Sequence, residues 1–233
     1  MLGVMSRQDV LLVLGTGMGK SACFMLPALA LKKSCVVIVP TKALMADLMR
    51  STAALSVTCE CWDAGMATYG LPTLVLVQVE QTTAREFRAW LQTLLLNGSL
   101  CCICIDEIHL AFQWNNPSFR PRFNALCQMR SLAHPVPWLF LTATLSQQEL
   151  HLLTTSFNLE HLRVIQGPVV QLRHYYQVCN TVNDGFDASL LAIQRAVQRY
   201  PNDKGICYSA TIAGCGRLVQ ALLQAGITFT SLI

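Results

Sequence analysis

Short apolar runs alternate with longer segments of helical period along this chain, and this alternation limits the possible folds more than any other feature. The apolar runs are rich in β-branched residues, as expected of strands buried on both faces of a parallel sheet. The predicted strands are 10–14, 35–39, 74–77, 101–105, 138–141 and 206–209. The predicted helices are 21–31, 42–53, 82–95, 147–156, 188–200 and 211–225. The pattern therefore predicts an α/β fold in which helices flank a parallel sheet.

The composition argues against a disordered chain and against a membrane span. Hydrophobic residues make up 53% of the sequence and charged residues 13%, which is typical of a chain with a large core. Charges such as Lys32, Lys33 and Asp47 interrupt every apolar run before it reaches the roughly 18 residues needed to cross a bilayer. Asp9 interrupts the apolar start and argues against a secretory signal. The net charge of +4 is too small to indicate nucleic-acid binding by itself.

The cysteines indicate reduced thiols. The chain holds 11 of them, an odd number, and several lie in the apolar run Cys101-Cys102-Ile103-Cys104-Ile105. Cys59-Glu60-Cys61 lacks a second pair of ligands at the spacing of a zinc site. We therefore expect free, mostly buried thiols in a reducing, intracellular compartment.

A glycine-rich turn follows the first predicted strand and leads into a helix. It reads Leu14-Gly15-Thr16-Gly17-Met18-Gly19-Lys20-Ser21, a looser form of the phosphate-binding loop because Leu14 stands where the strict pattern has glycine. Glycines let backbone N–H groups surround phosphate oxygens, Lys20 supplies a positive charge, and the Ser21 hydroxyl can bind Mg²⁺. Considered alone, the loop could also be an ordinary glycine turn.

Two acidic residues, Asp106 and Glu107, end the apolar run 101–105. Alone, they could be a helix cap or a solvated turn. With a phosphate loop upstream, we interpret Asp106 as a ligand of Mg²⁺ and Glu107 as the group that orients or deprotonates the attacking water. Both loops should meet beyond the carboxyl ends of the strands, where such sheets bind ligands.

Three motifs resemble those of superfamily-two helicases. Asp106-Glu107-Ile108-His109 resembles their DEAH-type box, and Thr142-Ala143-Thr144 resembles their Ser/Thr-Ala-Thr motif. Pro40-Thr41-Lys42 is similar to the motif that grips the nucleic-acid backbone.

A further loop resembles the RecQ helicases within that superfamily. Gln113-Trp114 followed by Phe119-Arg120-Pro121 is similar to their aromatic-rich loop, which reads Gln-Trp-Gly-His-Asp-Phe-Arg-Pro. In this chain Asn115-Asn116-Pro117-Ser118 replaces the Gly-His-Asp piece. The segment 205–211 resembles the first strand of the family's second RecA-like domain.

This resemblance implies a RecA-like, P-loop ATP-binding domain over residues 1–180 and part of a second RecA-like domain over 181–233. It implies ATP and Mg²⁺ as cofactors. The residues expected around the phosphates are Gly17, Met18, Gly19, Lys20 and Ser21. Those expected on Mg²⁺ are Ser21 and Asp106, and those expected to take part in ATP hydrolysis are Lys20, Asp106 and Glu107.

The resemblance also implies that the partner is DNA, either single-stranded or a tailed duplex, along which the enzyme moves 3′ to 5′. The residues expected to contact DNA are Thr41, Lys42, Trp114, Phe119 and Arg120. Those expected to couple the nucleotide to DNA are His109, Gln113, Thr142 and Thr144. A function in DNA repair and recombination follows, in the nucleus or in the cytoplasm of a prokaryote.

Several family motifs do not occur in this sequence, namely the adenine-reading glutamine motif, the later arginine-bearing motifs, and the zinc-binding and winged-helix regions. We therefore expect a fragment of a helicase that does not unwind DNA by itself. The alternative is a catalytically incomplete module that binds nucleotide and nucleic acid, or a gene relic.

Overall fold

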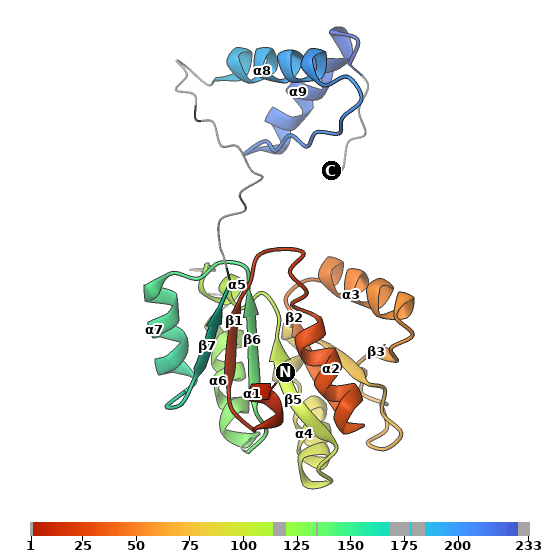
Figure 1. Cartoon of the computed structure of the whole chain (residues 1–233), viewed down its shortest axis with the longest axis vertical. Helices are drawn as coiled ribbons and strands as arrows, with labels where there is room; N and C mark the ends of the chain where they lie inside the picture. The colour runs from red at the N-terminus through yellow and green to blue at the C-terminus, as the bar shows by residue number, and fades with distance from the viewer. Residues whose placement is uncertain (1, 114–119, 134, 168–177, 179–184, 228–233) are drawn as a thin grey trace. The chain divides into compact units, whose positions relative to one another are not determined.

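The structure, a computed structural model of the 233-residue chain, describes residues 2–113, 120–133, 135–167, 178 and 185–227. It divides into two compact units, Met1–Gln171 and Leu172–Ile233 (Figure 1). The boundary predicted near residue 180 lies outside the described residues, and the assignment of two RecA-like domains stays a prediction.

A seven-stranded sheet forms the centre of the first unit, with the strand order β3-β4-β2-β5-β6-β1-β7 and parallel pairing throughout. The strands are β1 (Val10–Val13), β2 (Ser34–Val39), β3 (Cys59–Cys61), β4 (Leu74–Gln78), β5 (Leu100–Ile105), β6 (Trp138–Thr142) and β7 (Arg163–Gln166). All residues of β1, β2, β5 and β6 are buried. This burial explains why those strands are continuous apolar runs in the sequence.

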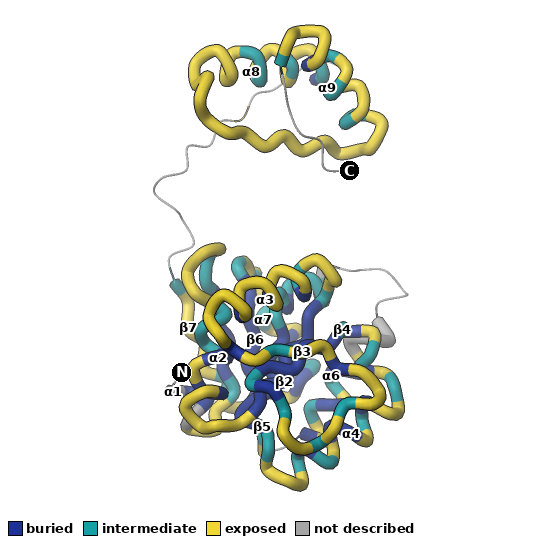
Figure 2. Tube along the Cα trace, turned by 90° about the vertical axis from the view of Figure 1, so that its right-hand side faces the viewer, coloured by how far each residue is buried: buried dark blue, intermediate teal, exposed yellow. Residues whose placement is uncertain are grey.

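Helices cover both faces of this sheet. They are α1 (Leu2–Met5), α2 (Ala22–Leu31), α3 (Lys42–Ala54), α4 (Arg85–Leu96), α5 (His109–Gln113), α6 (Arg120–Leu132) and α7 (Gln147–Ser156), with a 3₁₀ turn at Val79–Thr83. One apolar cluster packs α2 and α3 against one face, and another packs α4, α6 and α7 against the other. Figure 2 shows the buried strands enclosed by helices whose outer surfaces are exposed.

The predicted α/β class is confirmed, and the five predicted strands of the first unit form. The sequence reading missed β3 and β7, which are short strands at the two edges of the sheet. All four residues of β7 are exposed, so this strand lacks the buried apolar pattern on which the prediction depended. Helix α6 was also missed.

In the second unit, α8 (Phe186–Arg199) and α9 (Ile212–Gln224) form close to their predicted bounds. The guanidinium of Arg217 lies 4.9 Å from the centre of the Phe186 ring and joins the two helices. The strand predicted at 206–209 is wrong, because residues 205–209 are irregular and exposed. A strand needs a hydrogen-bonded neighbour, and the described part of this unit offers none.

No helix among the described residues of the chain is both long and apolar enough to cross a membrane.

Candidate nucleotide site

Three predicted loops meet at the carboxyl ends of β1, β5 and β6. The strand order places β6 between β5 and β1. Across these junctions, the N–H of Leu14 donates to the carbonyl of Thr142 at 3.0 Å, and the N–H of Ile108 donates to the carbonyl of Leu141 at 2.9 Å. Backbone hydrogen bonds therefore hold the glycine-rich loop, the acidic pair and the Thr142 motif against one another.

The glycine-rich loop has the backbone shape that a phosphate cradle needs. Gly17 and Gly19 both have φ of +79°, a conformation that residues with a side chain rarely adopt. A Cβ at either position would meet no described atom within 4 Å, so backbone conformation and not crowding requires glycine there. Met18, between them, is exposed. Ser21 precedes α2 and makes no side-chain capping hydrogen bond, which leaves its hydroxyl available to a ligand.

Lys20 folds back across the loop toward the acidic pair. Its Nζ donates to the carbonyl of Leu14 at 3.2 Å and lies 3.6 Å from Oε1 of Glu107. Both side chains are largely buried, with 13% and 20% of their surfaces exposed. Glu107 thus neutralises the positive charge of Lys20, which the sequence predicts to bind phosphate.

Glu107 occupies a strained position. Its φ of +49° lies in the left-handed region, which costs a residue other than glycine about 1–2 kcal/mol. Its Oε2 is buried and has no hydrogen-bond partner among the described residues, although His109 Nδ1 lies 3.2 Å away. A buried carboxylate oxygen without a donor is poised for a cation or a water molecule.

His109 directs its proton to Thr142. The Nδ1 atom of His109 lies 2.9 Å from Oγ1 of Thr142, and this hydroxyl donates its single proton to the carbonyl of Thr144 at 2.6 Å. The Thr142 oxygen must therefore accept from His109, which places the imidazole proton on Nδ1. The ion pair of Lys20 with Glu107 and the hydrogen bond of His109 with Thr142 therefore lie next to each other, with Oε2 of Glu107 3.2 Å from Nδ1 of His109.

Asp106 carries an unfavourable negative charge. Burial, with the nearby charge of Glu107, raises the pKa of Asp106 to about 6, although the Glu107 N–H and Lys20 act in the opposite direction. The Glu107 N–H donates to Oδ1 of Asp106 at 3.0 Å. A bound cation would remove this penalty. The Asp106 carboxylate and the Ser21 hydroxyl are oxygen ligands of the kind that Mg²⁺ prefers, so these residues fit this metal.

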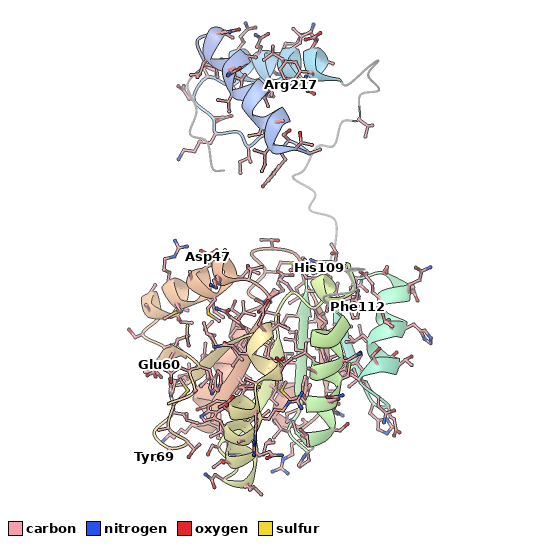
Figure 3. The ribbon with its side chains drawn as sticks, turned by 180° about the vertical axis from the view of Figure 1, so that it is seen from behind. Asp47, Glu60, Tyr69, His109, Phe112 and Arg217 are labelled. Carbon is pink, nitrogen blue, oxygen red and sulfur yellow. The ribbon has the colours of Figure 1, made fainter. Side chains whose placement is uncertain are left out.

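Ser21 and Asp106 face a common pocket of about 480 Å³. Helix α3 supplies the remaining lining residues, Leu44, Asp47, Leu48, Arg50 and Ser51. None of these α3 residues was predicted as a site residue, although Leu44, Asp47, Leu48 and Ser51 share one helix face at spacings of three and four. Figure 3 shows Asp47 on α3 and His109 at the same edge of the first unit.

The residues predicted to contact DNA are only partly described. Thr41 and Lys42 are exposed at the start of α3, where Oγ1 of Thr41 accepts the Leu44 N–H at 3.2 Å and caps the helix. Trp114 and Phe119 lie outside the described residues. Gln113 ends α5 and Arg120 begins α6, and the description of these two residues is limited to the backbone.

Comparisons with known proteins agree with these motifs. Residues 1–153 match the DEAD/DEAH box helicase family. RecQ-like DNA helicase blm-1 of Caenorhabditis elegans is 25% identical over 97% of this chain, and ATP-dependent DNA helicase RecQ of Synechocystis sp. is 30% identical over 96%. The chain spans 24% and 49% of the lengths of these two relatives.

Solved structures share the fold. The structure of the DUF1998 helicase MrfA bound to DNA and AMPPNP matches 96% of this chain with a TM-score of 0.72. The sequences are 14% identical, and the match covers 34% of that protein. At this identity the likeness supports the RecA-like fold and no more.

Proposed function

Since the chain belongs to the DEAD/DEAH box helicase family, we propose that it is the ATP-binding core of a RecQ-type DNA helicase that uses Mg·ATP to move 3′ to 5′ on DNA. The observation that carries this proposal is the close grouping of the Lys20–Glu107 ion pair with the His109–Thr142 hydrogen bond. These contacts join a phosphate loop, an acidic pair and a third motif in the order expected of a nucleotide-driven motor. The polarity rests on the resemblance to RecQ helicases.

In this proposal the side chains exchange partners when nucleotide binds. Mg²⁺, when bound, offsets the negative charge that the phosphates carry. Ser21 and Asp106 hold the metal, and Lys20 leaves the carbonyl of Leu14 for a phosphate oxygen. Glu107, released from Lys20, orients the attacking water and accepts its proton. The new position of Glu107 alters the hydrogen bond between His109 and Thr142, and through Thr142 it affects the segment around Thr144.

We place DNA on the exposed start of α3 and on the segment around Trp114. The N-terminus of a helix favours phosphate, and Lys42 adds a positive charge there. Trp114 would stack on a base, with Phe119 beside it and Arg120 on the backbone. Single-stranded or tailed DNA is the expected ligand, in keeping with relatives named as DNA helicases.

We further propose that the 233-residue chain does not unwind DNA by itself. The described part of its second unit holds two helices and no strand, whereas translocation requires two lobes that close and open around ATP. This observation also favours the alternative of a binding module without full catalytic machinery. The test is a strand-separation assay on a duplex with a 3′ single-stranded tail. Unwinding by the wild-type chain that is lost in Glu107→Gln would contradict the proposal that the chain does not unwind DNA by itself.

A function in DNA repair or recombination, in a nucleus or a prokaryotic cytoplasm, belongs to the same proposed helicase function.

Titration of the chain with Mg·ATP tests the nucleotide site. We expect Lys20→Ala to weaken binding by about 1.5–3 kcal/mol, roughly 10-fold to 100-fold, because a charge-assisted contact to phosphate is lost. Lys33→Ala is the control, since Lys33 is exposed beyond the end of α2. Equal affinity of the two variants would contradict the assignment of the phosphate loop.

A further inference from the structure

A register shift between β2 and β5 gathers three cysteines on one face of the sheet. Ser34 pairs with Leu100 whereas Cys35 pairs with Cys102, so Cys101 is an extra residue in β5. Consecutive residues of a regular strand point to opposite faces, but a bulge sets two residues of one strand against one of its neighbour. Cys35, Cys101 and Cys102 consequently belong to the same apolar cluster, beneath α2 and α3.

The three sulfur atoms are close enough to share one ion. The Sγ atoms of Cys35 and Cys102 are 3.3 Å apart, and those of Cys101 and Cys102 are 3.6 Å apart. All three lie within 4.8 Å of one another. Sulfur atoms at these separations can each approach a single ion at a metal–sulfur distance of about 2.3 Å.

We propose that Cys35, Cys101 and Cys102 form a binding site for Cu(I). Thiolates select soft ions, and Cu(I) accepts three sulfur ligands. Zn²⁺ almost always takes four ligands in a structural site. The described residues contribute three ligand atoms to this group, and its surroundings are apolar. A monovalent ion also needs the fewest thiolates to balance its charge, which matters in an apolar core.

The three thiols of the cluster influence one another's acidity. Hydrogen bonds from Cys102 and Cys35 lower the pKa of the Cys101 thiol. Burial raises the pKa of Cys35, and the interaction with Cys101 raises that of Cys102. The ion binds at the three sulfur atoms that the bulge brings together. Each thiol that binds as a thiolate releases one proton, and copper stays in the +1 state.

The site is separate from the nucleotide site. Asp106 directly follows β5 and lies four residues after Cys102, which is roughly 13 Å at about 3.3 Å per residue. Cys35 and Cys102 are fully buried, and Cys101, at 5% exposed, is the member of the group nearest the surface. Copper binding can thus be measured without nucleotide, and its outcome does not depend on the proposed helicase function.

The test uses the reduced 233-residue chain under oxygen-free conditions, titrated with Cu(I) against the chelator bicinchoninate. We expect about one equivalent of Cu(I) per chain to be retained, with three sulfur neighbours at about 2.3 Å by X-ray absorption. Cys101→Ala and Cys102→Ala should lose this equivalent. Cys61→Ser should keep it, because Cys61 belongs to a different, exposed sulfur pair with Met49, at 3.4 Å.

Circular dichroism establishes that each variant is folded, and Cys101→Ala, at the rim of the cluster, decides the question if Cys102→Ala does not fold. Transfer of all copper from the wild-type chain to the chelator would overturn the proposal. Retention by Cys101→Ala would contradict the three-cysteine site, and loss in Cys61→Ser would assign the ion to the exposed pair instead. Retention of Zn²⁺ in preference to Cu(I) would contradict the choice of ion.

Discussion

Glu107 has the most demanding position of any residue in the site. It adopts a left-handed backbone conformation, pairs with Lys20, and keeps one buried oxygen without a hydrogen-bond partner among the described residues. These features place negative charge where the proposed ATP hydrolysis would need a cation and a polarised water. The negative charge of Glu107 also destabilises the charged form of its neighbour Asp106, which burial already disfavours.

Asp106→Asn should therefore stabilise the fold at neutral pH. The pKa of Asp106 in the folded chain, about 6, lies above the usual value of about 3.9, so folding favours its protonated form. Its ionisation removes stability as pH rises through this interval. Asparagine is neutral and can still accept the Glu107 N–H. Above pH 6 we expect a gain of about 2–3 kcal/mol in the free energy of unfolding.

Urea unfolding at pH 7.5 and at pH 4 measures this gain, which should fade at the lower pH because Asp106 is then protonated in the folded chain and about half protonated in the unfolded chain. Asp47→Asn on the exposed face of α3 is the control and should show no such gain. A gain that is the same at both pH values would mean that charge is not its cause.

Individual site residues could be identified from the sequence, but their contacts could not. Each motif is a local pattern, so Lys20, Glu107 and Thr142 were found from their immediate neighbours. The pairing of Lys20 with Glu107 depends on the strand order, because β6 lies between the strands that carry them. Spacing along the chain does not reveal that order.

Among the elements, α3 links the pocket to the proposed DNA surface. Its residues line the space beside Ser21 and Asp106, and its first turn presents Thr41 and Lys42. A helix cap is thus part of the proposed binding site.

Thr41→Ala should weaken both the fold and DNA binding. Loss of the cap costs about 0.5–2 kcal/mol of stability, and loss of the hydroxyl removes a donor to phosphate. Ser146→Ala is the matched control, because Ser146 caps α7 through the N–H of Glu149 and was not assigned to DNA. Fluorescence anisotropy with labelled single-stranded DNA should separate the two variants, which are expected to lose similar stability. Equal DNA affinity of both variants would remove Thr41 from the DNA surface.

Strands with both faces buried were predictable, and the short edge strands were not. The central strands appear as apolar runs because both of their faces are covered, whereas β7 is exposed and left no such pattern. Helix α6 left a weak signal, since Ala125, Leu126 and Met129 are buried at helical spacing but lie among polar residues. The apolar segment 206–209 was predicted as a strand but does not form one. Its local composition favours a strand, but composition does not show whether a neighbouring strand is present to pair with it.

At the scale of the whole molecule, we propose that one chain binds both nucleotide and DNA. The family match covers residues 1–153, within the first unit. The contact from His109 through Thr142 to Thr144 is the proposed route by which each ligand affects the other. Such coupling is reciprocal, so it can be measured from either ligand.

The most direct test of this account is the affinity of the chain for Mg·ATP, measured with and without saturating single-stranded DNA. We predict that DNA raises the affinity of the wild-type chain by about 5-fold or more, the lower end of typical coupling. Thr142→Val, which removes the hydroxyl between His109 and Thr144, should bind Mg·ATP but lose this effect. Thr93→Val, on the exposed side of α4, should keep it. An affinity for Mg·ATP that DNA does not change in the wild-type chain would contradict the claim that this is the ATP-binding core of a DNA motor.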